Sequence, residues 1–139
     1  KGELKHVRIL GPERSATQIE LAQTDCRNIG IKAPVRSSGD TKGTPGVTLR
    51  GPNGTLTVPE GVMIADRHIH MTPAQAAAFG LADDDRVQVK IDGPKPGVMG
   101  GVLIRANDKC ALDFHIDTDD GNAFLLKQGQ LVTVLGKEE

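Results

Sequence analysis

Residues 67–91 read RHIHMTPAQAAAFGLADDDRVQVKI, and this stretch decides the fold. It opens with an alternating run, passes through Thr72-Pro73 into an alanine-rich segment, stops at Gly80 and ends in a second alternating run at 86–91. Alternation of apolar and polar residues is typical of half-buried strands, and Thr followed by Pro is a typical helix start. The stretch therefore predicts a strand, a short capped helix and another strand.

The same pattern recurs weakly along the chain. Three short helices are predicted, from Thr24-Asp25 to Gly30, from Thr72 to Gly80 and from Thr118 to Gly129, and similar strands follow the second and third. We therefore predict a mainly β protein made of two small related β-barrels. Residues 1–45 are assigned to the rest of the first barrel and a linker, and residues 46–139 to the second barrel. Nine strands are expected, at 7–10, 17–21, 47–50, 55–58, 62–70, 86–91, 101–106, 111–116 and 131–135.

Turn residues support this organisation. The sequence Gly51-Pro52-Asn53-Gly54 lies between two alternating runs, and Asn-Gly supplies the positive φ angles of tight hairpin turns, so the flanking strands should pair. The segment 32–45 is rich in Gly, Ser, Pro and Thr and shows no periodicity. It is predicted to be a loop or linker.

Composition excludes several classes of function. Lys and Arg number 17 and Asp and Glu 18, a net charge of −1, so no overall field attracts nucleic acid or an anionic membrane. No apolar run approaches the roughly 20 residues that a bilayer needs, and a soluble protein is expected. Cys26 and Cys110 lie in unrelated contexts and are expected to be buried thiols rather than a disulfide or a Cys-x-x-Cys knuckle.

The histidines suggest a metal site. A strand period of two places His68 and His70 on one face and Ile69 on the other. His115 also lies where a strand runs into a capped helix, and Glu20 holds the matching place before the first helix. Three imidazoles suit zinc and leave positions open for water or substrate. A His-x-His pair also arises by chance, but equivalent junctions favour a shared site over coincidence.

Arg14 is a candidate for anion binding. It lies in the turn before the strand that carries Glu20, and its planar donors can hold two oxygens of a phosphate or carboxylate. An arginine in a turn is, taken alone, better explained as a solvated charge. The acidic run Asp83-Asp84-Asp85 lacks the ligand spacing of a calcium loop and is interpreted as a solvated turn.

Four motifs together resemble the PduL-type phosphotransacylases, enzymes of bacterial microcompartments and of the cytosol. They are GPxRxxTQxE at 11–20, GIKAPVRxSGD at 30–40, RHIHMTP at 67–73 and HIDTD at 115–119. The resemblance implies a pair of β-barrels with a two-zinc site, and the interconversion of acetyl- or propanoyl-CoA plus phosphate with acyl phosphate plus CoA. It also implies roles for single residues: one zinc on His68, His70 and His115, the other on Glu20, phosphate on Arg14, and CoA on Arg8, Asn122 and Lys1.

One departure from the family limits this expectation. Its members usually carry a further N-terminal segment whose Arg-His-x-His motif supplies two ligands to the zinc bound by Glu20, and no second His-x-His occurs here. We expect a first barrel short of N-terminal strands and a partial enzyme. The segment is expected to be lost by proteolysis, absent by design, or supplied as a separate chain, which would then be a partner. A homo-oligomer in the cytoplasm or the microcompartment lumen is expected.

Three alternative functions follow from the residues together with the resemblance. The first is a zinc-dependent phosphate acyltransferase that acts by direct transfer, because neither cysteine lies beside the histidines in the sequence. The second is a non-catalytic zinc-binding barrel fragment that needs a separate N-terminal segment. The third is a two-metal hydrolase that uses water in place of phosphate.

Overall fold

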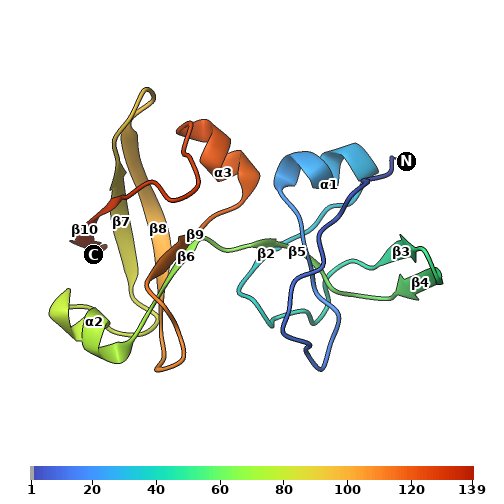
Figure 1. The fold of residues 1–139 in the computed structure, drawn as a ribbon, viewed down its shortest axis with the longest axis horizontal. Coiled ribbons are helices and arrows are strands. Elements are labelled where there is room, and N and C mark those ends of the chain that lie inside the picture. Colours follow the sequence, from blue (N-terminus) through green and yellow to red (C-terminus); the bar gives the residue numbers. More distant parts are fainter. Residues whose placement is uncertain (1) are drawn as a thin grey trace. The chain divides into compact units, whose positions relative to one another are not determined.

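The computed structural model describes residues 2–139, which form ten strands and three short helices (Figure 1). The protein is mainly β, as predicted. The chain divides into two compact units, one ending at Ala65 and the other comprising Asp66–Glu139. The predicted division between residues 45 and 46 falls inside the first of these units. Within residues 2–139, no helix has both the length and the apolar character needed to cross a bilayer.

The first unit contains a small parallel sheet in the order β1-β5-β2 and a separate hairpin of β3 and β4. Helix α1 ends where Gly30 adopts φ 74°, and its N-cap is Ala22, which makes no side-chain cap. The prediction that Thr24-Asp25 caps this helix was therefore wrong. The elements are β1 (Ile19–Glu20), α1 (Gln23–Ile29), β2 (Val35–Arg36), β3 (Val47–Gly51), β4 (Gly54–Val58) and β5 (Val62–Ala65).

The hairpin pairs as predicted, in a continuous antiparallel register from Val47 and Val58 to Gly51 and Gly54. Its loop differs from the prediction. Pro52 and Asn53 form the two-residue connection, and positive φ occurs at Gly54, with φ 147°, rather than at Asn53. Proline has a fixed negative φ, which is incompatible with the first central position of a primed turn.

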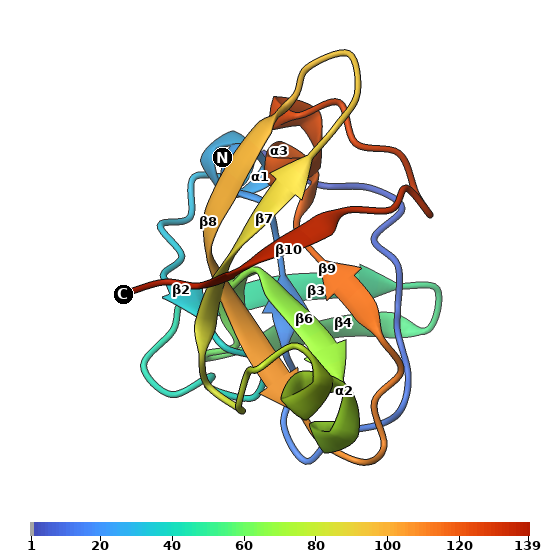
Figure 2. The ribbon, with the colours of Figure 1, turned by 90° about the vertical axis from the view of Figure 1, so that its left-hand side faces the viewer.

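The second unit is built on one five-stranded sheet in the order β10-β7-β8-β6-β9. Strands β6 and β8 are parallel and the other neighbours are antiparallel. Figure 2 shows β10, β7 and β8 side by side. The elements are β6 (His68–Met71), α2 (Pro73–Ala78), β7 (Arg86–Ile91), β8 (Gly97–Ala106), β9 (Asp113–His115), α3 (Thr118–Ala123) and β10 (Thr133–Lys137).

The core of this unit lies on one face of the sheet. Alternation in β7 buries Val87, Val89 and Ile91 completely, and Ile69 and Met71 of β6 join the same cluster. Each of these side chains contributes about 1.5–3 kcal/mol to folding by leaving water. The polar residues of β6 consequently lie on the opposite face, where His68 is buried and His70 is half-buried.

Helix α2 begins as the sequence predicts. The Thr72 hydroxyl accepts a hydrogen bond from the Gln75 backbone N–H at 3.2 Å, and the Thr72 N–H donates to the Gln75 side chain at 2.9 Å. Pro73 occupies the first turn, where its missing N–H costs nothing. This capping box fixes the direction in which the chain leaves β6.

Several predicted elements were wrong. Residues 7–10 form no strand; no described strand pairs with them, and Ile9 is 96% exposed. The predicted loop 32–45 contains β2, and the strand predicted at 62–70 is divided into β5 and β6. Helix α3 ends at Ala123, short of Gly129, because Leu125 adopts φ 53°.

The described strands do not close into a barrel. The edges of the larger sheet, β10 and β9, are not paired with each other, and the smaller sheet holds only three short strands. The prediction of two small related barrels is therefore not established and remains a proposal.

Candidate metal centre

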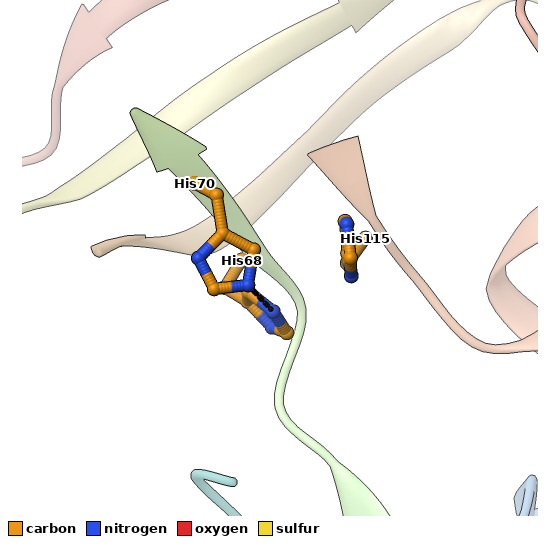
Figure 3. Close-up of side chains that lie close together, drawn as sticks. All are labelled: His68, His70 and His115. Atoms are coloured by element: carbon orange, nitrogen blue, oxygen red, sulfur yellow. Dashed lines mark hydrogen bonds between the residues drawn. The ribbon is translucent and has the colours of Figure 1, made fainter. Parts of the chain in front are cut away.

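Three histidines converge on the polar face of the larger sheet, as Figure 3 shows. Because β6 alternates, His68 and His70 share that face, and the antiparallel register sets His115 of β9 directly opposite His68. The ring centroids are 4.7 Å apart for His68 and His70, 5.0 Å for His68 and His115, and 4.9 Å for His70 and His115. Two distant stretches of the chain thus meet at one point.

The separations suit a small divalent cation. One candidate ligand nitrogen from each ring lies within 4.8 Å of the others, and Nε2 of His68 is 3.1 Å from Nε2 of His70. Two nitrogens on a tetrahedral zinc ion, each at about 2.0–2.1 Å, lie roughly 3.3 Å apart. The cluster therefore fits zinc with small adjustments of the rings.

The second nitrogen of each ring already has a partner. Nδ1 of His68 lies 2.8 Å from the Asp66 carbonyl oxygen, and Nε2 of His115 lies 3.1 Å from a carboxylate oxygen of Asp113. Nδ1 of His70 lies 3.2 Å from Sγ of Cys110. Such outer contacts orient histidine ligands in metal sites. With these contacts kept, the nitrogens available to a shared cation are Nε2 of His68, Nε2 of His70 and Nδ1 of His115.

The electrostatics keep His70 in the form that binds metals. Burial lowers the pKa of His70 below its usual value, and the neighbouring His68, His115 and Arg105 lower this pKa further, while Asp113 opposes the shift. A histidine ligand must be neutral to offer its lone pair. The ring of His70 is accordingly ready for coordination at neutral pH.

An ion pair between Arg67 and Asp120 connects the segments that carry the histidines. Arg67, next to His68, donates to Asp120 of α3 at 2.9 Å and to the Gly100 carbonyl oxygen at 3.2 Å. Asp117 caps α3 by accepting from the Asp120 N–H at 2.8 Å, so α3 starts directly after β9. Burial raises the pKa of the Asp120 carboxyl above its usual value, and the attraction of Arg67 offsets only part of this rise. This contact holds α3 against the start of β6.

The first unit carries Arg14 and Glu20 in a separate polar network. Arg14 donates to the Ser38 hydroxyl at 3.0 Å, and the Gln18 amide donates to the same hydroxyl at 3.0 Å and to Glu20 at 2.5 Å. The Gly39 N–H donates to the Gln18 side-chain oxygen at 2.7 Å. Arg14 and Gln18 line a cavity of about 410 Å³. Arg14 and Glu20 are thus connected through Ser38 and Gln18.

Two of the residues expected to contact CoA, Arg8 and Asn122, belong to different units of the chain. Arg8 is exposed in the first unit. Asn122, also exposed, belongs to α3 and lines a cavity of about 720 Å³ in the second unit, together with Phe114 and Ile116. Lys1 lies outside the described residues. These CoA assignments therefore remain predictions.

Sequence reasoning missed the outer partners of the histidines. Asp113 stands two residues before His115 on the same strand face, so the period of two is a signal that would have found it. Cys110 lies in the turn between β8 and β9, where no periodicity applies. It is half-buried beside His70, whereas the sequence predicted a buried thiol.

Comparisons with known proteins all point to one family. A family model described as phosphate propanoyltransferase matches residues 1–127. The phosphate propanoyltransferase of Thermotoga maritima is 46% identical over 136 residues, which cover 97% of this chain and 65% of that protein. Those of Lachnoclostridium phytofermentans and Salmonella typhimurium are 44% and 48% identical over 95% and 88% of this chain, and 62% and 59% of their own lengths. The chain spans about three fifths of the length of these curated relatives.

Proposed function

The chain belongs to the phosphate propanoyltransferase family, and on that premise we propose that it transfers an acyl group between coenzyme A and phosphate. The substrates are acetyl- or propanoyl-CoA with phosphate, and the products are the acyl phosphate and CoA, in either direction. The observation that carries the proposal is the convergence of His68, His70 and His115 in a chain of this family. The names of the relatives support the reaction type.

Zinc is the cofactor that the donor set fits best. His68, His70 and His115 would hold one ion, and Glu20 would contribute to a second one. When bound, zinc supplies a Lewis acid for the thioester carbonyl and a soft partner for the CoA thiolate. Three nitrogens leave coordination positions open, as catalytic zinc sites require.

Arg14 is the residue proposed to hold phosphate. Its guanidinium lines the smaller cavity and is oriented by its hydrogen bond to the Ser38 hydroxyl, so a phosphate in that cavity would find a planar fork of donors. A phosphate oxygen attacks the thioester carbonyl carbon, the C–O bond forms, and the C–S bond breaks with its electron pair leaving on the CoA sulfur. Holding both substrates in line is the main contribution of the chain to the rate.

Arg8, Asn122 and Lys1 are proposed to contact CoA. Asn122 has the strongest support, because it lines a cavity in the unit that carries the histidines. The apolar part of that wall, including Phe114 and Ile116, suits the pantetheine arm of CoA, while the amide of Asn122 offers a donor and an acceptor.

The second candidate is a non-catalytic zinc-binding fragment that acts only with a separate N-terminal segment. One observation favours it: among residues 2–139, the histidine cluster is the sole group with metal-ligand spacing, and Glu20 belongs to no such group. The second zinc would then need ligands from that other segment.

We further propose that each unit belongs to a small β-barrel, that the protein forms a homo-oligomer, and that it acts in the cytoplasm or the lumen of a bacterial microcompartment. The family membership supports these proposals.

A single assay separates the candidates. The purified chain is loaded with zinc and given acetyl-CoA or propanoyl-CoA, with phosphate present or absent, and released CoA is followed with a thiol reagent. The assay is repeated with the N-terminal segment of the Thermotoga maritima relative added as a peptide. Phosphate-dependent release supports the transferase, phosphate-independent release supports a hydrolase, and release only with the peptide supports the fragment.

A further inference from the structure

We infer that Cys110 is a positioning residue of the metal centre, which holds the ring of His70 so that Nε2 points to the shared binding point. The inference deepens the proposed function and rests on it. The thiol lies 3.2 Å from Nδ1 of His70, and the turn that carries it is fixed by a hydrogen bond from the Cys110 N–H to the Asn107 carbonyl oxygen at 3.2 Å.

The hydrogen bonds around the two neighbouring rings run in one direction. The Asp66 carbonyl oxygen can only accept, so Nδ1 of His68 carries a hydrogen and donates. When the His68 ring carries only this one hydrogen, its Nε2 is a lone pair and accepts from Nε2–H of His70. Nδ1 of His70 is left as an acceptor, and the Cys110 S–H donates to it.

Coordination at the inner nitrogens requires a change in only one of these rings. His68 already presents a lone pair at Nε2, whereas His70 must lose its hydrogen there and carry one on Nδ1 instead. The ring keeps the same number of hydrogens. Cys110 keeps its hydrogen as well, but its sulfur must now accept from Nδ1–H of His70 where its S–H previously donated.

A thiol suits this exchange because it both donates and accepts. The other outer partners, the Asp66 carbonyl and the Asp113 carboxylate, can only accept. Cys110 is therefore the partner in this cluster that can stabilise His70 both before and after coordination. A serine hydroxyl has the same two capacities, and an alanine methyl has neither.

The first test measures zinc affinity by competition with a chromophoric chelator. Cys110→Ala is expected to weaken binding by about 10-fold to 100-fold, the usual loss for an outer partner of a histidine ligand. Cys110→Ser is expected to bind zinc nearly as well as the wild type. Lys109→Ala, in the same turn, is the matched control and is expected to leave affinity unchanged. Equal affinity of Cys110→Ala and wild type would overturn the inference.

The second test reads the His70 ring directly, by ¹⁵N NMR at a pH where the imidazoles are neutral. Metal-free wild type is expected to show the Nε2–H tautomer, and zinc-loaded protein the Nδ1–H tautomer with Nε2 bound. In zinc-loaded Cys110→Ala, Nδ1–H should exchange with solvent faster than in the wild type and in Cys110→Ser. An Nδ1–H tautomer in the metal-free wild type would contradict the hydrogen-bond order.

These measurements distinguish a failure of the proposed metal centre from a failure of the role inferred for Cys110. If the wild-type chain binds no zinc, the proposed metal centre fails, while the metal-free NMR spectrum still decides whether Cys110 holds His70. If Cys110→Ser binds zinc like the wild type but loses all acyl transfer, Cys110 is a nucleophile, and its role as a positioning residue is overturned. Circular dichroism verifies that each variant is folded.

Discussion

The ion pair between Arg67 and Asp120 should respond unequally to removal of its two members. Asp120→Asn is expected to leave the stability of the metal-free chain within about 0.5 kcal/mol of the wild type, because an amide oxygen can still accept from Arg67. Arg67→Ala is expected to destabilise it, because the carboxylate of Asp120 would remain half-buried without its cation.

The magnitude follows from the exposure of the pair. Breaking a fully buried ion pair from one side costs about 3–5 kcal/mol. Here the side chains of Arg67 and Asp120 are 34% and 24% exposed, so solvent screens part of the interaction. We expect a loss of about 2 kcal/mol for Arg67→Ala, and recovery of roughly half of it in the double variant Arg67→Ala/Asp120→Asn.

The pH dependence has a definite sign. Burial raises the pKa of Asp120 more than Arg67 lowers it, and the nearby Asp117 and Asp119 raise it too. A carboxyl with a raised pKa in the folded state contributes stability below the ordinary aspartate pKa and loses it as the pH rises through the folded value. Stability of the wild type relative to Asp120→Asn should therefore fall across that interval and then level off.

The assay is chemical unfolding of metal-free protein followed by circular dichroism, since the chain has neither Trp nor Tyr for fluorescence. NMR signals of the three clustered histidines report the second unit separately. If Asp120→Asn destabilises the chain as much as Arg67→Ala does, or if the two effects simply add, burial does not dominate this pair and the reasoning is refuted.

Three further predictions follow from other contacts. Arg14→Ala should raise the phosphate KM of acyl transfer by about 10-fold to 100-fold, because charge-assisted hydrogen bonds contribute roughly 1.5–3 kcal/mol, while zinc content stays unchanged; equal loss of zinc and activity would argue against its role. Thr72→Ala should destabilise the chain by about 1 kcal/mol through loss of the α2 cap, and a Gln75→Ala background should reduce that cost; thermal unfolding of the four proteins would show no coupling if the cap were unimportant. Removal of metal with a chelator should leave the circular dichroism spectrum unchanged, because the histidines lie on the face of the sheet opposite the core; unfolding on chelation would contradict this.

The sequence predicted much of the second unit because its local patterns agree with its packing. Alternation in 86–91 alone determines which side chains of β7 are buried, and the period of two places His68 and His70 together. The start of α2 was predictable because Thr72, Pro73 and Gln75 form its cap among themselves. In each case the deciding contacts lie within a few residues of one another.

The remaining features depend on contacts between distant residues. The segment 7–10 alternates like a strand, but a strand also needs a neighbour to accept its hydrogen bonds. Conversely, β2 consists of Val35 and Arg36 in a segment without periodicity, and it exists because β5 pairs with it. Cys110 reaches His70 across 40 positions of sequence, which no local pattern reveals.

X-ray absorption at the zinc edge tests most directly whether the three imidazoles form one metal centre. In the chain loaded with a single equivalent of zinc, the first shell should contain three imidazole nitrogens at about 2.0–2.1 Å, reduced to two in His115→Ala. A first shell of oxygens without imidazole scattering, or one that contains sulfur from Cys110, would contradict the account.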